Sequence, residues 1–315
     1  VDLIAPGTRL PSVWKANLAF DHELPWYGIV ASAEVLVTKV KSDLFYRSIN
    51  IGDSTFQGQD GRDIYYNPAQ VGRAWTTGSN RFNRNRSFGN VYLLENTDKG
   101  RSSQFTVSLA KPFSPESDWS WTVGYTYTDS DMVSDMTSST AGSTWNYNYI
   151  FDANEEKTGT SRYQIRNRVS SSINWSHAFF GDYKTSVGMF YEGRNGRPFS
   201  YVYSNDANGE GRAGNDLFYV PSGPGDVLFG TLSSTGVFTA NPAMEASFFN
   251  WLAANPDLAR YAGQAVPRNS GRAQWVNNFD VRISQELPGF MKGHKSEIWL
   301  DIMNVGNLIN KDWGH

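Results

Sequence analysis

Residues 158–195 read TGTSRYQIRNRVSSSINWSHAFF, then GD, then YKTSVGMFYEGRN, and this stretch decides the fold. Successive residues of a β-strand point to opposite faces of a sheet, so residues of one parity share a face. One parity here is apolar or aromatic, and its members are Tyr163, Ile165, Val169, Ile173, Trp175, Tyr183, Val187, Met189 and Tyr191. The other parity is rich in Arg, Ser, Asn, Lys and Glu. The stretch predicts a β-hairpin with one apolar face and one charged face.

The apolar face of this hairpin ends in aromatic residues beside the short turn at residues 181–182. A transmembrane β-barrel has this arrangement, because its strands turn apolar side chains to lipid and polar ones to the lumen, with aromatic girdles at both interfaces. A soluble β-sandwich also alternates, but its inner face seldom carries Tyr and Trp at its ends. The pattern therefore favours the barrel over the sandwich.

The same alternation recurs along the chain. It predicts strands at residues 12–24, 29–50, 90–111, 119–129, 275–287 and 295–303, with a bulge at 98–100. Short turns alternate with long polar loops at 51–89, 130–157 and 196–274; within the last, Pro242 and Pro256 predict short helices at 241–250 and 256–261. Short periplasmic turns and long extracellular loops are typical of outer-membrane proteins. We expect an all-β fold, an antiparallel transmembrane β-barrel of which this chain supplies about eight strands.

Composition excludes several other classes. The 315 residues carry a net charge of -3, which gives no hint of a nucleic-acid partner. They contain no Cys, so a disulfide framework and a thiolate metal site are excluded. No apolar run is long enough for a transmembrane helix. The four His residues are scattered and no Ser–His–Asp grouping stands out, so we expect no enzyme.

The charged parity of the strands predicts a polar, lumen-facing surface. On the lipid face each Arg near the midplane would cost roughly 2–4 kcal/mol. The residues expected to face the lumen, or a plug inside it, are Glu34, Arg162, Gln164, Arg166, Arg168, Asp280, Arg282 and Glu286.

The long loops contain two groups of candidate substrate-binding residues. Arg73, Arg81, Arg84 and Arg86 could hold an anionic substrate or lipopolysaccharide phosphates by bidentate pairing. A solvated charged loop is the alternative. Aromatic residues could stack on a sugar or aryl ligand, or could pack the loops, and these are Trp75, Phe82, Trp145, Tyr147, Tyr149, Tyr201 and Tyr203.

Residues 206–211 read DANGEG and resemble the start of a calcium loop, in which oxygen ligands alternate and a Gly makes the turn. The predicted Ca²⁺ ligands are Asp206, Asn208, Glu210 and Asp216. Leu217 stands where an EF-hand has its bidentate Glu, and Asp216 is one residue short. The alternative is an Asn/Gly turn in a solvated loop. No other cofactor is expected.

Several phrases resemble the C-terminal half of TonB-dependent outer-membrane receptors, especially the Oar-like branch. In chain order they are NVYLLEN at 90–96, GRPFSY at 196–201, DANGEG at 206–211, GNDLFYVP at 214–221, PRNSGR at 267–272 and DIMNVGNLIN at 301–310. The resemblance implies a 22-stranded barrel around an N-terminal plug. It implies that residues 1–315 are the C-terminal part of the barrel domain, with the plug and closing strands outside this chain.

The resemblance also implies a function and a location. Such receptors take up scarce nutrients, such as ferric siderophores, sugars or peptides, across the bacterial outer membrane, driven by the TonB complex acting on the plug. The expected partners are therefore outer-membrane lipid, lipopolysaccharide, TonB and a small-molecule, glycan or peptide substrate. The alternatives are a non-transporting surface, adhesion or complex-forming protein, and an outer-membrane enzyme or passive porin.

Overall fold

A computed structural model describes residues 1–66, 83–233 and 237–311. Its main sheet contains eight long strands in the order of the chain: β2 (Ser12–Glu23), β3 (Val30–Ser48), β7 (Gly100–Lys111), β8 (Trp119–Met132), β10 (Asn167–Phe180), β11 (Tyr183–Arg194), β18 (Val276–Pro288) and β19 (Lys295–Ile302). Each pairs antiparallel with its neighbours. The antiparallel sheet and its eight strands confirm that part of the prediction. Within the described residues β2 and β19 are its edges and do not pair with each other.

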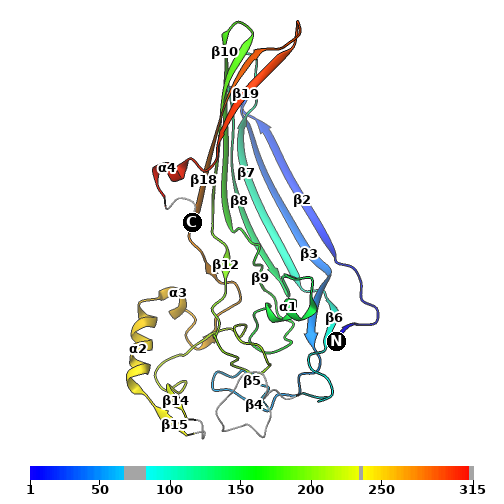
Figure 1. The fold of residues 1–315 in the computed structure, drawn as a ribbon, viewed down its shortest axis with the longest axis vertical. Helices are drawn as coiled ribbons and strands as arrows, with labels where there is room; N and C mark the ends of the chain where they lie inside the picture. Colours follow the sequence, from blue (N-terminus) through cyan, green and yellow to red (C-terminus); the bar gives the residue numbers. More distant parts are fainter. Residues whose placement is uncertain (67–82, 234–236, 312–315) are drawn as a thin grey trace.

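The connections differ sharply between the two ends of the main sheet (Figure 1). Residues 24–29, 112–118, 181–182 and 289–294 make four short turns at one end. At the other end, residues 49–91, 133–166 and 195–275 make long connections, as the sequence predicts. Among the helices in the described part of the chain, none is long and apolar enough to cross a membrane.

Two predicted strands have different bounds in the structure. The expected strand at 90–111 is broken into β6 (Tyr92–Thr97) and β7, which pair with successive parts of β3. Gly100 makes the break with a φ of +134°. The short β1 (Asp2–Ile4) adds to β6 in parallel. The first arm of the hairpin begins at Asn167, so Arg162, Gln164 and Arg166 precede the strand.

The long connections fold together into a compact layer, which we call the loop layer and define as the described residues within 49–91, 133–166 and 195–275. Its small elements are β4 (Phe56–Gln57), β5 (Asp63–Ile64), α1 (Ala141–Asn146), β9 (Gly159–Thr160), β12 (Pro198–Phe199), β13 (Tyr219–Val220), β14 (Gly230–Leu232), β15 (Phe238–Ala240), α2 (Pro242–Ala253), α3 (Pro256–Ala259), β16 (Gln264–Ala265) and β17 (Gly271–Arg272). A final short helix, α4 (Gly306–Ile309), follows β19. Both predicted helices are present. Asn241 caps α2 by accepting the Met244 N–H, and Pro242 occupies its first turn.

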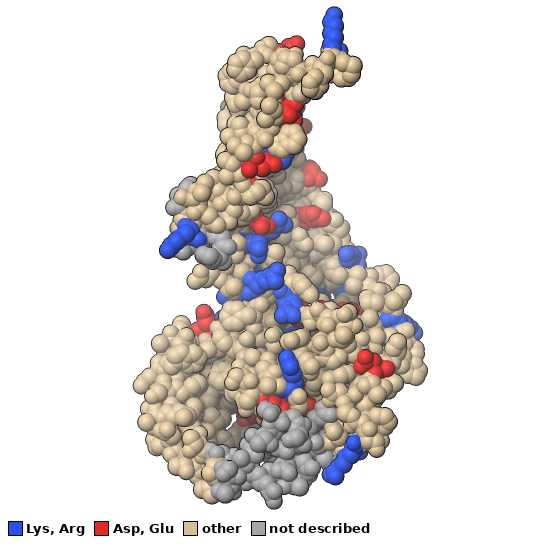
Figure 2. Space-filling view, viewed as in Figure 1, with Lys and Arg blue, Asp and Glu red and all other residues tan. Residues whose placement is uncertain are grey.

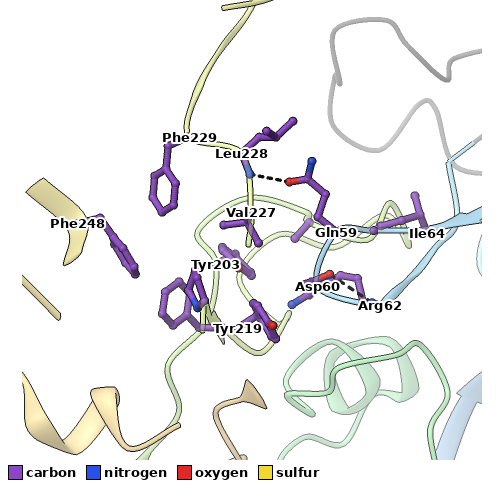
Figure 3. A pocket seen from close by; sticks show the side chains of 14 residues that line it. Gln59, Asp60, Arg62, Ile64, Tyr203, Tyr219, Val227, Leu228, Phe229 and Phe248 are labelled. Carbon is purple, nitrogen blue, oxygen red and sulfur yellow. Dashed lines mark hydrogen bonds and ion pairs between the residues drawn. The ribbon is translucent and has the colours of Figure 1, made fainter. Parts of the chain in front are cut away.

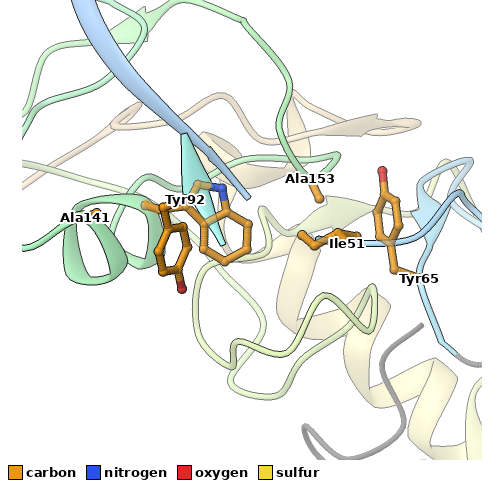
Figure 4. Close-up of a cluster of buried hydrophobic side chains, with 6 residues drawn as sticks. Ile51, Tyr65, Tyr92, Ala141 and Ala153 are labelled. Atoms are coloured by element: carbon orange, nitrogen blue, oxygen red, sulfur yellow. The ribbon is translucent and has the colours of Figure 1, made fainter. Parts of the chain in front are cut away.

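The buried apolar clusters of the described residues lie in the loop layer and the adjoining β6. One joins Ile51, Tyr65, Tyr92, Ala141, Trp145 and Ala153 (Figure 4). The other is formed by Val220, Leu252, Leu258 and Val266 under a cover of aromatic residues. The described main sheet has no comparable core, and most of its large exposed apolar side chains lie on one face, although Phe190 and Trp299 are exposed on the other.

Candidate ligand site in the loop layer

Arg62 is a buried cation of the loop layer. It follows the tight turn between β4 and β5, where Gly61 has a φ of +81°. Its side chain is 2% exposed, and Nε lies 2.7 Å from Asp60 Oδ2. Nη2 donates to the Leu217 carbonyl at 2.7 Å, and Nη1 lies 3.4 Å from Asp216 Oδ1. Arg62 therefore joins the β4–β5 hairpin to the connection between β12 and β13.

Aromatic rings complete the surroundings of this guanidinium. Its centre lies 4.7 Å from the Phe151 ring centroid and 5.0 Å from that of Tyr203. Burial raises the pKa of the Tyr203 hydroxyl, and the Arg62 charge partly opposes that rise. Cation–π contacts of a buried guanidinium are worth more than exposed ones. Ion pairs, hydrogen bonds and cation–π contacts therefore all fix the Arg62 side chain in place.

A cavity of about 420 Å³ opens beside Arg62 (Figure 3). Its lining is mostly apolar and aromatic, with Tyr203, Phe218, Tyr219, Phe229 and Phe248 supplying rings. Gln59 Oε1 accepts the Leu228 N–H at 2.8 Å, which fastens one side of the cavity to the β4–β5 hairpin. An apolar cavity with a few fixed polar groups is the usual form of a small-molecule site. We call it the aromatic cavity.

A second cavity lies where the loop layer meets the main sheet. It has a volume of about 610 Å³, and its lining includes Arg162, Gln164, Arg194 and Arg197. Arg194 shares the carboxylate of Glu192 with Arg168, at 3.3 Å and 2.6 Å respectively. Figure 2 shows basic side chains gathered at mid-height on the face in view, between the sheet and the loop layer. This cavity is suited to an anion.

The loop at residues 206–216 lies against the aromatic cavity, which Ala207 lines. The four predicted Ca²⁺ ligands all lie in this loop, but among the described residues no three acidic or His side chains converge on one point, so Ca²⁺ binding stays a prediction. Asp206 is 4% exposed, and Asn208, Glu210 and Asp216 are 0% exposed. Burial, with the neighbouring Asp216 charge, raises the pKa of Glu210 to about 8. Burial also raises the pKa of Asp216 to about 7, although the Ala207 N–H and Arg62 oppose it. The four named side chains are therefore buried, although Gly211 and Ala213 of the same loop are exposed.

The other predicted loop residues are placed separately. Arg73, Trp75, Arg81 and Phe82 lie outside the described residues. Arg84 pairs with Asp53 at 2.6 Å and Arg86 is exposed. Trp145 is 4% exposed within the first apolar cluster, so it packs the layer and does not present a stacking surface. The other predicted aromatic residues lie at four different places. Tyr147 contacts Arg212, Tyr149 lines a small cavity, Tyr201 packs against the second apolar cluster and Tyr203 lines the aromatic cavity.

The expected lumen-facing residues within strands share one face of the main sheet. Cross-strand register aligns Glu34 with Thr106, Thr126 and Arg168. Two of the others make cross-strand ion pairs: Arg282 with Asp301 at 2.5 Å and Glu286 with Lys295 at 2.7 Å. Asp280 accepts the Asn304 N–H. Arg162 and Arg166 precede β10; Arg162 lines the second cavity, and Arg166 Nη2 lies 3.6 Å from Asp129 Oδ1.

Sequence reasoning missed Asp60, Arg62, Asn215 and most of the aromatic cavity. A lone Arg in a Gly-Arg-Asp turn carries no periodic or motif signal, and its burial depends on contacts more than 150 residues away. The one usable signal was the phrase GNDLFYVP, which supplies Asn215, Phe218 and Tyr219.

Comparison with known proteins gives a structural likeness but no sequence match. No family model and no curated protein sequence matches the chain. The crystal structure of the outer membrane transporter YddB from Escherichia coli superimposes with a TM-score of 0.46 at 10% sequence identity. The match covers 97% of this chain and 30% of that one, so the chain spans less than a third of the transporter's length. A likeness of this degree assigns neither family nor function.

Proposed function

We propose that this chain is part of an outer-membrane β-barrel that takes up a nutrient, with the loop layer as its ligand-binding surface. The observation that carries the proposal is a row of apolar side chains running across four strands. Leu18, Val35, Phe105 and Tyr127 are paired in register and are between 38% and 77% exposed. The neighbouring row on the opposite face is polar and includes Glu34 and Arg168.

An apolar surface this large needs a non-aqueous neighbour. Exposed apolar patches beyond a few hundred Å² mark membrane or protein contacts. Strict alternation with a polar face is the lipid-facing pattern of a transmembrane strand. Trp119 and Trp175 pair near the short turns with ring centroids 6.4 Å apart, in the position of an interfacial aromatic girdle.

The edges β2 and β19 carry unpaired backbone groups that hydrocarbon does not tolerate. Further strands must therefore pair with both edges in the membrane. This requirement supports a wide barrel of the TonB-dependent type, whose lumen the ion-paired face would line. In such a barrel the loop layer is extracellular, and its aromatic cavity would take a ring-bearing ligand, such as an aryl or sugar group.

The membrane orientation can be tested by cysteine labelling, because residues 1–315 contain no Cys. Phe105→Cys and Thr106→Cys, made in the full-length protein in its membrane, differ by one residue and point to opposite faces. We expect a lipid-soluble maleimide to label position 105, and a polar maleimide to label position 106 alone. Labelling of both positions by the polar reagent would place this face in water.

Transport is tested by uptake into cells. A strain lacking the full-length gene, and an otherwise normal strain lacking TonB, are compared for uptake of a labelled panel of ferric chelates, sugars and short peptides. We expect the same compound to fail in both strains. Uptake that persists without TonB would reject energised transport. Unchanged uptake of the whole panel in the gene deletion would favour the non-transporting surface protein.

A further inference from the structure

Three arginines gather at the second cavity, where the loop layer meets the main sheet. Arg162 and Arg197 line this cavity of about 610 Å³. Arg272 reaches the same wall, because its Nη2 donates to Oε1 of Gln164, which lines the cavity too. Among the described residues, no carboxylate lies within ion-pairing distance of these three guanidinium groups. The wall therefore carries positive charge that the described residues do not neutralise.

Two carboxylates of the main sheet lie beside this wall, and both already have arginine partners. Glu192 Oε1 lies 2.6 Å from Arg168 Nε, and its Oε2 lies 3.3 Å from Nε of Arg194, which lines the cavity. Asp129 Oδ1 lies 3.6 Å from Arg166 Nη2. Even within this ion-paired group the arginines outnumber the carboxylates, so neither acid neutralises the wall.

Arg272 and Arg166 also contain buried N–H groups without acceptors. Nε and Nη1 of Arg272 and Nε of Arg166 are shielded from solvent and have no hydrogen-bond partner. Burial lowers the pKa of the Arg272 guanidinium and the Arg166 charge lowers it further, whereas the Asp129 charge opposes them. A buried charge without compensation is unfavourable, and a nearby anion reduces that cost through its field even where it does not touch the group. These two arginines therefore favour an anion in the cavity from behind its wall.

Backbone contacts fix the two sides of the cavity. On one side β12 pairs with β17, and the Ala273 N–H donates to the Arg197 carbonyl at 3.0 Å. Gly196 is buried there, and a Cβ at this position would overlap the facing backbone, so glycine lets the two segments approach this closely. On the other side Asp135 Oδ1 accepts the Arg162 N–H at 3.1 Å. Folded backbone thus positions Arg162 and Arg197.

The size and the rest of the lining suit an organic ligand. Thr137 supplies a hydroxyl group, Tyr163 a ring and Ile165 an apolar surface. Each guanidinium can donate two parallel hydrogen bonds to a carboxylate or phosphate. Small-molecule sites have volumes of roughly 300–1,000 Å³, so a single phosphate or chloride ion would leave most of this cavity unfilled. Volume and charge together indicate a molecule with several anionic groups.

We infer that this cavity binds a soluble organic ligand carrying two or more carboxylate or phosphate groups. Arg162, Arg194 and Arg197 would contact the anionic groups, and Arg272 would attract them from behind the wall. The inference goes beyond the proposed function, because this cavity shares no lining residue with the aromatic cavity and its binding is measured without transport.

The position of the cavity favours a solute over a lipid headgroup. Arg194 continues the polar row of the main sheet, because it pairs in register with Arg168. The phosphates of a lipid packed against the apolar row would lie across the sheet from the cavity. A solute on the polar side therefore reaches these arginines more easily than lipopolysaccharide does.

The test uses the full-length protein in detergent and two soluble oligoanions, citrate and tripolyphosphate. Triethyl citrate has the citrate skeleton without its charges and is the control ligand. Calorimetry should show saturable binding of at least one oligoanion and none of the triester. Binding should weaken as the ionic strength rises, because salt screens the arginine charges.

Arg162→Gln and Arg197→Gln keep a hydrogen-bond donor but remove the charge. Each should weaken binding roughly tenfold, since hydrogen bonds to charged groups are the stronger ones. The matched control is Arg260→Gln in the loop layer, where the Arg260 guanidinium lies 4.8 Å from the Tyr261 ring centroid and outside the cavity lining. This control should bind like the wild type. Equal weakening by all three variants would mean that the overall charge of the protein attracts the anion, and would overturn the site.

A second readout needs no variant, so it remains valid if a substitution prevents folding. In the wild type, the bound oligoanion should slow amide exchange at residues 161–165 and 195–197, whereas triethyl citrate should not. No saturable binding of either oligoanion up to roughly 10 mM, beyond the millimolar end of ordinary affinities, would overturn the inference. Saturable binding of lipopolysaccharide in place of both solutes would assign the arginines to lipid and would overturn it too. The cysteine labelling and uptake experiments test the proposed function independently of these outcomes.

Discussion

The main sheet and the loop layer use aromatic residues in opposite ways. Trp14 on β2 is 66% exposed, whereas Trp145 in α1 is 4% exposed between Tyr92 and its neighbours. The ion pairs of the two regions differ in burial as well. Arg282 of the sheet makes an exposed ion pair, and Arg62 of the loop layer makes a buried one. The main sheet thus exposes an apolar face and a polar face, while the connections contain the packed apolar clusters. A long polar loop in such a sequence can be a folded layer in its own right.

The largest effect should follow from removing the buried cation of the loop layer. Arg62→Met keeps a long apolar stem but leaves Asp60 and Asp216 without their guanidinium. Breaking a buried pair by removing one partner costs about 3–5 kcal/mol. Hydrogen exchange of residues 58–64 and 206–217 measures the local opening free energy. The control is Arg84→Met, since Arg84 and Asp53 are exposed by 59% and 83% and should matter little. Equal exchange in both variants would show that Arg62 does not hold the layer.

A smaller effect should separate the two faces of the main sheet. Phe105→Arg places a charge on the apolar row, where Arg near the membrane midplane costs about 2–4 kcal/mol. Thr106→Arg places the same charge opposite Glu34 on the polar face, where it can form an ion pair. Denaturant unfolding of the full-length barrel in lipid vesicles measures both. If the two variants lost equal stability, the apolar row would not face lipid.

These two variants also show what the sequence could and could not predict. Alternation fixes the face of Phe105 and Thr106 from local sequence, because the period of two is a backbone property. It predicted the eight strands and their short turns for the same reason. It failed at residues 161–166, where Gln164 N–H bonds to the Ser161 carbonyl and the chain turns before entering β10.

The site in the loop layer was predicted only in part. The DANGEG segment stood out in the sequence because calcium loops place oxygen-bearing residues at fixed local spacing, and Ca²⁺ binding by this segment stays a prediction. Its burial was not predictable, since it depends on Tyr66 and Arg62 from another connection. Trp145 shows the same limit: nothing local distinguishes a Trp that packs α1 against β6 from one that faces a ligand.

Asn154 is one of the side chains that join the loop layer to the main sheet. Asn154 Oδ1 accepts the Ser48 N–H at 2.7 Å and Trp145 Nε1 at 3.2 Å, and Nδ2 donates to the Ser48 carbonyl at 2.9 Å. Asn154→Ala leaves these buried groups unsatisfied, at a cost of about 1–3 kcal/mol. Hydrogen exchange of α1 and the end of β3 measures the loss.

A glycine at the same position separates hydrogen bonding from backbone strain. Asn154 has a φ of +64°, which Ala adopts only with strain and Gly adopts freely. Asn154→Gly should therefore be less destabilising than Asn154→Ala by about 1 kcal/mol. A larger loss in the Gly variant would mean that contacts of the Cβ, and not the amide, join the loop layer to β3.

The smallest effect should be a change in pH dependence without loss of the fold. Burial raises the pKa of Glu155 above its usual range, although the Phe151 N–H and Lys157 oppose the rise, and Asp152 and Arg268 lie near. The folded layer then binds this proton more tightly than the unfolded chain does. Its free energy of unfolding should fall as the pH rises from the ordinary carboxyl pKa through the raised one.

Glu155→Gln retains an acceptor for the Phe151 N–H, which Glu155 Oε1 accepts at 2.8 Å, and removes the titrating group. The variant should lose part of that pH slope and be more stable than the wild type above the raised pKa. Exchange rates in the loop layer, measured across the pH range and corrected for intrinsic chemistry, give the slope. A steeper slope in the variant would mean that the Glu155 carboxylate is stabilised by Lys157 and Arg268 more than it is penalised by burial. The loop layer would then stabilise its buried charge by ion pairs between elements, as the main sheet does for its exposed charges.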